Sequence, residues 1–172
     1  MRPAIFVGLS ALLAVSIPYP SSSYAEARNV DLTKTSALFA LLATKAQLLS
    51  IMRTRHDGME AIGKAARTTT RALTSDSPDL TAVRQSAGQI ETLSRQASGW
   101  FPAGTGPELT KTRAKPEIWK NLRDFNGKMM LFQRSAAVFN RTAAGSNVDT
   151  IKAQYGQLAR TCKACHDTYR SD

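Results

Sequence analysis

The sequence predicts an all-α protein, folded as an antiparallel up-down four-helix bundle. Every long segment repeats its apolar residues at intervals of three, four or seven, which keeps one face of a helix apolar. No segment alternates apolar and polar residues as a half-buried strand would. Four helical segments with short connections are typical of a bundle in which successive helices run in opposite directions.

The first helix is expected to begin near Asp31 or Thr33, because either residue can cap a helix. It is expected to weaken at residues 68–70, three consecutive threonines, because β-branched side chains are unfavourable in helices. The residues of its predicted inward face are Leu38, Leu41, Leu48, Met52, Met59, Ile62 and Ala66.

Proline and glycine mark the boundaries of the second and third predicted helices. Ser77-Pro78 supplies a cap and a favourable first residue for the second helix, which ends before Trp100. Residues 103–107 are a loop by composition, and the third helix begins at Pro116. The inner face of the second helix contains Leu80, Val83, Ala87, Ile90 and Leu93. That of the third contains Ile118, Trp119, Leu122, Phe125, Met129, Phe132, Ala136 and Phe139.

Residues 1–25 have the organisation of a secretory signal peptide. Arg2 gives a positive start, residues 4–17 are apolar, and cleavage is expected after Ala25 or after Ala27. The apolar stretch is shorter than the roughly 20 residues that a membrane-spanning helix needs, which disfavours the alternative of an uncleaved anchor. We therefore expect an exported, periplasmic protein whose single domain is a bundle of residues 26–172, without stable membrane insertion.

The formal charge of the chain is +10, from 23 basic and 13 acidic residues. Residues 1–25 contain one basic residue, Arg2, and no acidic residue, so that the mature chain carries +9. A basic surface attracts partners with acidic docking surfaces. The Lys and Arg residues are scattered without a polybasic run, which argues against nucleic acid as a partner.

The fourth predicted helix, from Val148 onward, carries the run Cys162-Lys163-Ala164-Cys165-His166. This C-x-x-C-H spacing is the attachment signature of c-type haem: two thiols form thioethers with the porphyrin, and the adjacent imidazole is the proximal iron ligand. The motif contains both cysteines of the chain. We therefore predict one covalent haem c, bound near the C-terminal end of the fourth helix.

The same residues have three alternative uses. A thioredoxin-like redox pair needs a βαβ context, and no strand pattern lies near Cys162. A zinc site would combine Cys162, Cys165 and His166 with His56, the second histidine, but structural zinc sites usually repeat a paired-ligand module. The third alternative is a structural disulfide.

Four segments, in order, resemble the class II c-type cytochromes, which comprise cytochrome c prime and its six-coordinate, low-spin relatives. They are residues 55–59 with 62–63 in the first helix, 101–106 after the second, 115–119 at the start of the third, and 162–170. The resemblance covers essentially the whole mature chain. It implies the four-helix bundle with covalent haem, and a homodimer formed through the first two helices in many relatives.

The resemblance also implies roles for several residues. Met59 corresponds to the family position that faces the iron from the distal side, with Met52, two turns earlier, as a competitor. Arg55 is expected to pair with a haem propionate, because guanidinium matches carboxylate in a fork. His56, where the family often has Gln, is expected at the haem edge rather than on the iron. Arg170 lies one turn after His166 and is either a proximal cation or a solvated side chain.

The expected function is that of a periplasmic monohaem cytochrome that carries single electrons, with His166 as proximal and Met59 as distal ligand. Methionine ligation raises the potential of haem iron. The alternative is a five-coordinate protein that binds NO or another small gas, with Met59 only packing over the iron. An enzyme such as a peroxidase is not expected, because adjacent Arg55 and His56 point about 100° apart on a helix.

Overall fold

The structure is a computed structural model that describes residues 32–171. The predicted signal peptide and both cleavage sites therefore lie outside the described residues. The chain divides into two units, Met1–Ala40 and Leu41–Asp172. In the first unit the described residues, 32–40, form the beginning of one helix, and the rest of the described fold belongs to the second unit.

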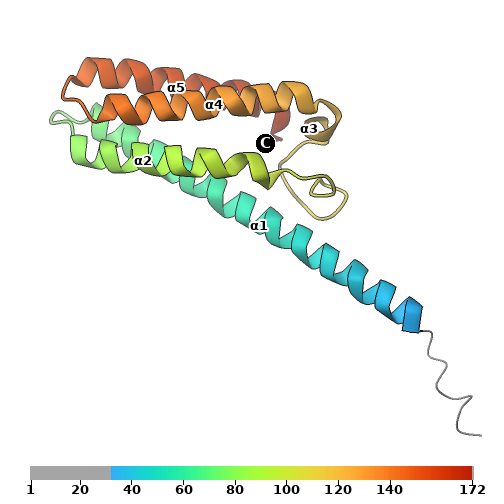
Figure 1. The fold of residues 1–172 in the computed structure, drawn as a ribbon. Helices are drawn as coiled ribbons and strands as arrows, with labels where there is room; N and C mark the ends of the chain where they lie inside the picture. Colours follow the sequence, from blue (N-terminus) through green and yellow to red (C-terminus); the bar gives the residue numbers. More distant parts are fainter. Residues whose placement is uncertain (1–31, 172) are drawn as a thin grey trace, which may run out of the picture. The chain divides into compact units, whose positions relative to one another are not determined.

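The second unit is a helical bundle (Figure 1). The described elements are α1 (Leu32–Thr74), α2 (Leu80–Ala97), the short 3₁₀ helix η2 (Ser98–Trp100), α3 (Glu117–Lys120), α4 (Leu122–Ala143) and α5 (Val148–Tyr169). Helices α4 and α5 lie side by side, and α2 packs against α4 (Figure 1). The hydroxyl of Tyr155 on α5 donates to the carbonyl of Ala66 on α1 at 2.7 Å. The predicted all-α four-helix bundle is confirmed.

Helix α1 begins at Leu32, next to the predicted start, but it differs from the prediction in its length and in the residues that it buries. It continues past residues 68–70 to Thr74, because Thr69 and Thr70 donate hydrogen bonds to carbonyls one turn earlier and remain compatible with the helix. Leu38 and Leu41 were expected to face inward, yet they are 56% and 67% exposed. The apolar stripe of α1 becomes buried only further along, at Met52.

The second and third predicted helices also differ from the structure in their details. Helix α2 is capped by Asp79 rather than Ser77, because the Asp79 carboxylate accepts from the amides of Thr81 and Ala82, both at 3.0 Å. The predicted third helix is interrupted at Asn121, whose φ of −125° and ψ of 47° separate α3 from α4. Leu122, expected in the buried stripe, is 47% exposed as the first residue of α4.

The core lies between the apolar faces of α1, α2, α4 and α5. Its largest fully buried apolar side chains are Val83, Ile90, Ile118, Phe139, Ile151 and Leu158. Met59, Phe101, Trp119, Tyr155 and both cysteines are half-buried and pack against this cluster. In the part of the chain that the structure describes, no helix has the length and apolar character needed to cross a membrane.

Candidate functional site

The two cysteines lie on the buried stripe of α5. Leu158 and Tyr169 are buried at 2% and 3% exposure, and Cys162 and Cys165 occupy the positions between them at helical spacing. Both thiols are free and half-buried. The stripe therefore directs two thiols, three residues apart, from one helix face towards the core cluster.

Burial also controls the protonation of the motif. It raises the pKa of the Cys162 and Cys165 thiols, because an apolar environment disfavours the thiolate. The pKa of His166 is lowered, first by desolvation and then by the positive charges of Arg170 and Arg113. The imidazole of His166 is therefore neutral at pH 7, the form that ligates iron.

This set of donors fits a covalent haem. Two thiols for thioethers and one neutral imidazole lie within five consecutive residues at the end of α5. The zinc alternative lacks its fourth ligand: among residues 32–171, no group of three or more His, Cys, Asp or Glu side chains gathers at one point. His56 instead lies on the exposed side of α1, 3.5 Å from Glu60.

Arg55 is buried between α1 and the segment that follows α2. Its Nη1 donates to the Trp100 carbonyl at 3.4 Å and to Thr105 Oγ1 at 3.2 Å. Its Nη2 donates to the Thr105 carbonyl at 2.9 Å and to Thr112 Oγ1 at 3.1 Å. The guanidinium also lies 5.0 Å from the ring centre of Phe101. Arg55 thus joins one turn of α1 to residues 100–112, while its predicted pairing with a propionate stays a prediction.

Gly58, one turn after Arg55, makes a second contact with the same segment. A Cβ added to Gly58 would lie 2.6 Å from Cζ2 and 2.7 Å from Cζ3 of Trp100, and closer still to Cη2. Trp100 is 5% exposed and belongs to the core cluster. The indole therefore rests directly on the backbone of α1, which only glycine permits at this position.

Met59 and Met52 both lie on the inner side of α1. Met59 is half-buried and packs against the core cluster, as the two cysteines do from α5. Met52 is 7% exposed and belongs to the buried apolar residues of the fold. The structure thus brings Met59 and the cysteines to one cluster, and their contacts with haem stay predictions.

The loop before α3 and the C-terminus are tied together next to the motif. Ala114 and Arg170 form an isolated antiparallel bridge, with Lys115 N donating to the Tyr169 carbonyl at 3.0 Å. The Tyr169 hydroxyl donates to Asp124 Oδ2 on α4 at 2.6 Å. Phe125 packs edge-on against Tyr169, with the ring centres 5.3 Å apart. These contacts hold Tyr169, in the same last turn of α5 as the exposed His166, against α4.

The left-handed backbone of Gly104, with φ of 79°, shapes the loop between η2 and α3. The indole N–H of Trp119 on α3 donates to the carbonyls of two loop residues, Phe101 and Pro102, at 3.2 and 3.0 Å. Hydrogen bonds to Trp119 and to Arg55 therefore hold this loop in place.

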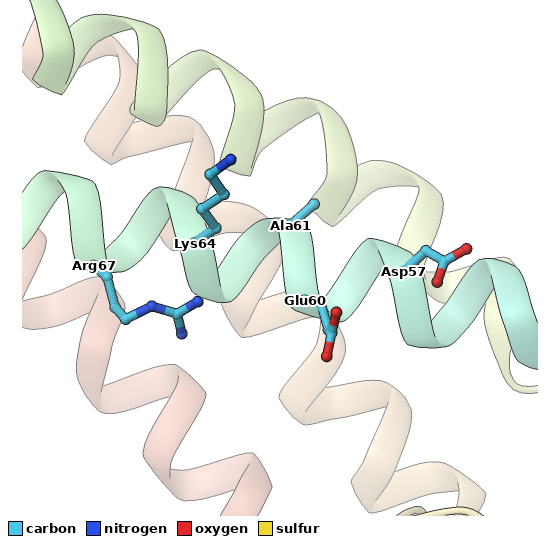
Figure 2. A pocket seen from close by; sticks show the side chains of 5 residues that line it. All are labelled: Asp57, Glu60, Ala61, Lys64 and Arg67. Carbon is cyan, nitrogen blue, oxygen red and sulfur yellow. The ribbon is translucent and has the colours of Figure 1, made fainter.

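An open surface hollow of about 370 Å³ is lined by residues of α1 alone, Asp57, Glu60, Ala61, Lys64 and Arg67 (Figure 2). Lys64 projects on the side of α1 opposite to Glu60 and Arg67 (Figure 2). The hollow contains none of the residues predicted for the haem site. Its charged side chains are typical of the solvated outer surface of a helix.

Comparison with known proteins identifies the family. Residues 50–170 match the family described as Cytochrome C'. The chain belongs to the cytochrome c prime family. Members of this family carry one covalently attached c-type haem, so the cofactor predicted from the motif is confirmed at the level of the family.

Individual relatives agree with this assignment. A cytochrome c' from Alcaligenes xylosoxydans xylosoxydans is 33% identical over 92 residues, which cover 54% of this chain and 69% of the relative. The solved cytochrome c prime from Shewanella frigidimarina is 27% identical with a TM-score of 0.68, covering 73% of this chain and 97% of that one. A solved mutant of cytochrome c prime from Alcaligenes xylosoxidans is 25% identical with a TM-score of 0.65, covering 73% and 96%.

Several contacts of the site were not predicted from the sequence. Thr105 and Thr112 bind Arg55 from 50 and 57 residues away, and no local pattern predicts such distant pairs. The same holds for Asp124 and Tyr169. Gly58 did leave a signal, because a glycine inside a long helix usually has a packing reason.

Proposed function

We propose that the protein is a monohaem c-type cytochrome that binds NO or another small gas at its distal face. In this proposal Cys162 and Cys165 attach the haem and His166 is the proximal ligand. Met59 packs over the distal face from α1 without binding the iron. Bound haem supplies an iron that changes oxidation state and accepts a small axial ligand.

The observation that carries the proposal is the match to cytochrome c prime together with its solved relatives. Two of these, both mutants of cytochrome c prime from Alcaligenes xylosoxidans, are nitric oxide complexes. Each is 25% identical to this chain, with a TM-score of 0.65. The half-buried position of Met59 among apolar neighbours also supports a packing role, since methionine readily fills irregular gaps.

The experiment is a pair of methionine substitutions in the haem-loaded protein, Met59→Ala and Met52→Ala. Optical and EPR spectra of both oxidation states, and titration with CO and NO, report the coordination of the iron. We expect a high-spin wild type that binds both gases. Met59→Ala should keep the high-spin spectrum and bind CO faster, because a distal side chain has been removed. Met52→Ala is the matched control for the loss of a buried methionine.

The electron carrier is the second candidate, favoured because the Met59 thioether is chemically suited to ligate haem iron. In that case the wild type has a sharp low-spin spectrum, and Met59→Ala converts it to high spin. A low-spin spectrum that Met59→Ala leaves unchanged but Met52→Ala abolishes would assign the distal ligand to Met52.

The proposal includes the setting in which the protein acts. We place it in the periplasm, on the signal-peptide organisation of residues 1–25. Redox proteins with acidic docking surfaces are its partners, given the charge of +9 on the mature chain. The proposal includes no catalytic function. A homodimer belongs to the proposal, because a cytochrome c' of similar fold, 25% identical with a TM-score of 0.67, has a ligand-controlled dimer dissociation.

A further inference from the structure

We infer that the contact between Gly58 and Trp100 sets how closely Met59 approaches the haem, so that residue 58 controls access to the distal face. The inference deepens the proposed function, on which it rests. It makes Gly58 and Trp100 positioning residues: neither needs to touch the gas, and both act through the placement of α1.

Gly58 and Trp100 are too close for any larger side chain at residue 58. Real Cβ atoms essentially never lie within 3.0 Å of a non-bonded heavy atom, and a Cβ on residue 58 would break this limit with three carbons of the Trp100 ring. Gly58 is buried and Trp100 is 5% exposed. Helix α1 therefore approaches η2 as closely as a helix backbone and an indole ring allow.

Arg55 holds the neighbouring turn of α1 to the same segment by hydrogen bonds. Its four hydrogen bonds to Trp100, Thr105 and Thr112 hold the helix against residues 100–112. Met59 follows Gly58 directly and extends into the core cluster. A shift of this turn therefore carries the Met59 side chain with it.

Steric pressure at residue 58 is relieved by movement of α1, since α1 is the partner with free space behind it. Arg53, His56 and Glu60, on the side of these turns opposite to Gly58 at helical spacing, are exposed. Trp100, in contrast, is backed by the close-packed core, which resists compression. An added methyl group at residue 58 should push α1 outward, withdraw Met59 and open the distal face.

The test is Gly58→Ala in the haem-loaded protein. We expect the association rate constant for CO to rise about tenfold, which corresponds to a change of about 1.4 kcal/mol in the activation free energy. An extra methyl group in a packed core changes the free energy by an amount of this order. The urea midpoint of unfolding, which does not depend on gas binding, should fall. Gly63→Ala is the matched control on the same helix, because its Cβ would meet only the flexible Nη1 of Arg67, at 3.4 Å. It should leave the CO rate unchanged.

A rescue variant separates positioning from simple damage. In Gly58→Ala/Trp100→Phe the smaller ring makes room for the methyl group, and the CO rate should return towards that of Trp100→Phe alone. A fall in the urea midpoint with an unchanged CO rate would show that Trp100 yields instead of α1, and would overturn the inference.

The proposed function can fail independently of this inference. If the wild type is low-spin and binds neither CO nor NO, the proposed gas binding is wrong. The spin state of the iron then replaces the CO rate as the measurement that tests the inference. The inference then requires Gly58→Ala to convert the spectrum towards high spin by withdrawing Met59, with Gly63→Ala remaining low-spin. A low-spin spectrum in both variants would contradict it.

Discussion

Arg55 is the only charged side chain that is buried among the described residues, at 5% exposure. Burial lowers the pKa of its guanidinium, yet arginine stays protonated in proteins. Two carbonyls and two threonine hydroxyls accept its hydrogen bonds, and the rings of Phe101 and Trp119 lie 5.0 and 6.0 Å away. A buried cation is thus stabilised by neutral acceptors and aromatic faces, which makes Arg55 a connector between α1 and residues 100–112.

Replacing Arg55 with alanine should lower the free energy of unfolding by about 3 kcal/mol, because buried carbonyls lose their donor and the packing against Phe101 is lost. The measurement is urea denaturation followed by far-UV circular dichroism. Arg53→Ala, an exposed arginine on the same helix, should change stability by no more than about 0.5 kcal/mol. Equal losses in the two variants would show that the hydrogen bonds of Arg55 contribute nothing specific.

At the scale of elements, the periodicity of apolar residues predicted the helices and most of their inner faces. The residues at which the helices begin and end differ from the prediction, because local side-chain contacts decide them. The buried residues of α2 include Val83, Ala87 and Ile90, as the spacing of apolar residues predicts. The predicted boundaries were wrong where more than one nearby residue could cap the helix: Asp79, and not Ser77, caps α2. Contacts between segments, such as Gly58 with Trp100, depend on packing distances that no local pattern contains.

The link between α4 and α5 makes stability depend on pH. The hydrogen bond from Tyr169 lowers the pKa of Asp124, while burial and this carboxylate raise the pKa of Tyr169 to about 12. A raised phenol pKa stabilises the fold below pH 10, and this contribution is lost as the pH rises from 10 to 12. A lowered carboxyl pKa stabilises the fold above the ordinary value of 3.8, and this contribution is lost as the pH falls through the folded-state pKa.

Tyr169→Phe should therefore be less stable than the wild type at neutral pH. At strongly acid and strongly alkaline pH, the difference in stability between the variant and the wild type should become smaller. Thermal unfolding across the acid, neutral and alkaline ranges measures this difference. Tyr155→Phe is the matched control, because the Tyr155 hydroxyl donates to the Ala66 carbonyl and not to a carboxylate. It should lower stability without the acid-side change that Tyr169→Phe produces, and an identical acid-side profile for both variants would rule out the role of Asp124.

At the scale of the whole molecule, positive charge dominates. The chain carries +10, and part of this charge acts on the motif: Arg170 and Arg113 lower the pKa of His166, and the charge of Lys128 opposes the rise in the pKa of Cys165. Charges of one sign around a site steer oppositely charged molecules towards it. The end of α5 is therefore the part of the surface where we expect anionic partners to approach first.

This steering should appear in the rate at which an anionic reductant such as ascorbate reduces the haem. We expect the rate to fall as ionic strength rises from about 0.01 M to about 1 M, because the Debye length shrinks from about 30 Å to about 3 Å. At low salt, Arg113→Gln should slow reduction about twofold, since one charge acting across roughly 10 Å of water is worth about 0.4 kcal/mol. Arg67→Gln, which removes an equal charge from the outer surface of α1, should leave the rate unchanged. Equal slowing by the two substitutions would mean that net charge, and not its placement around His166, governs the approach.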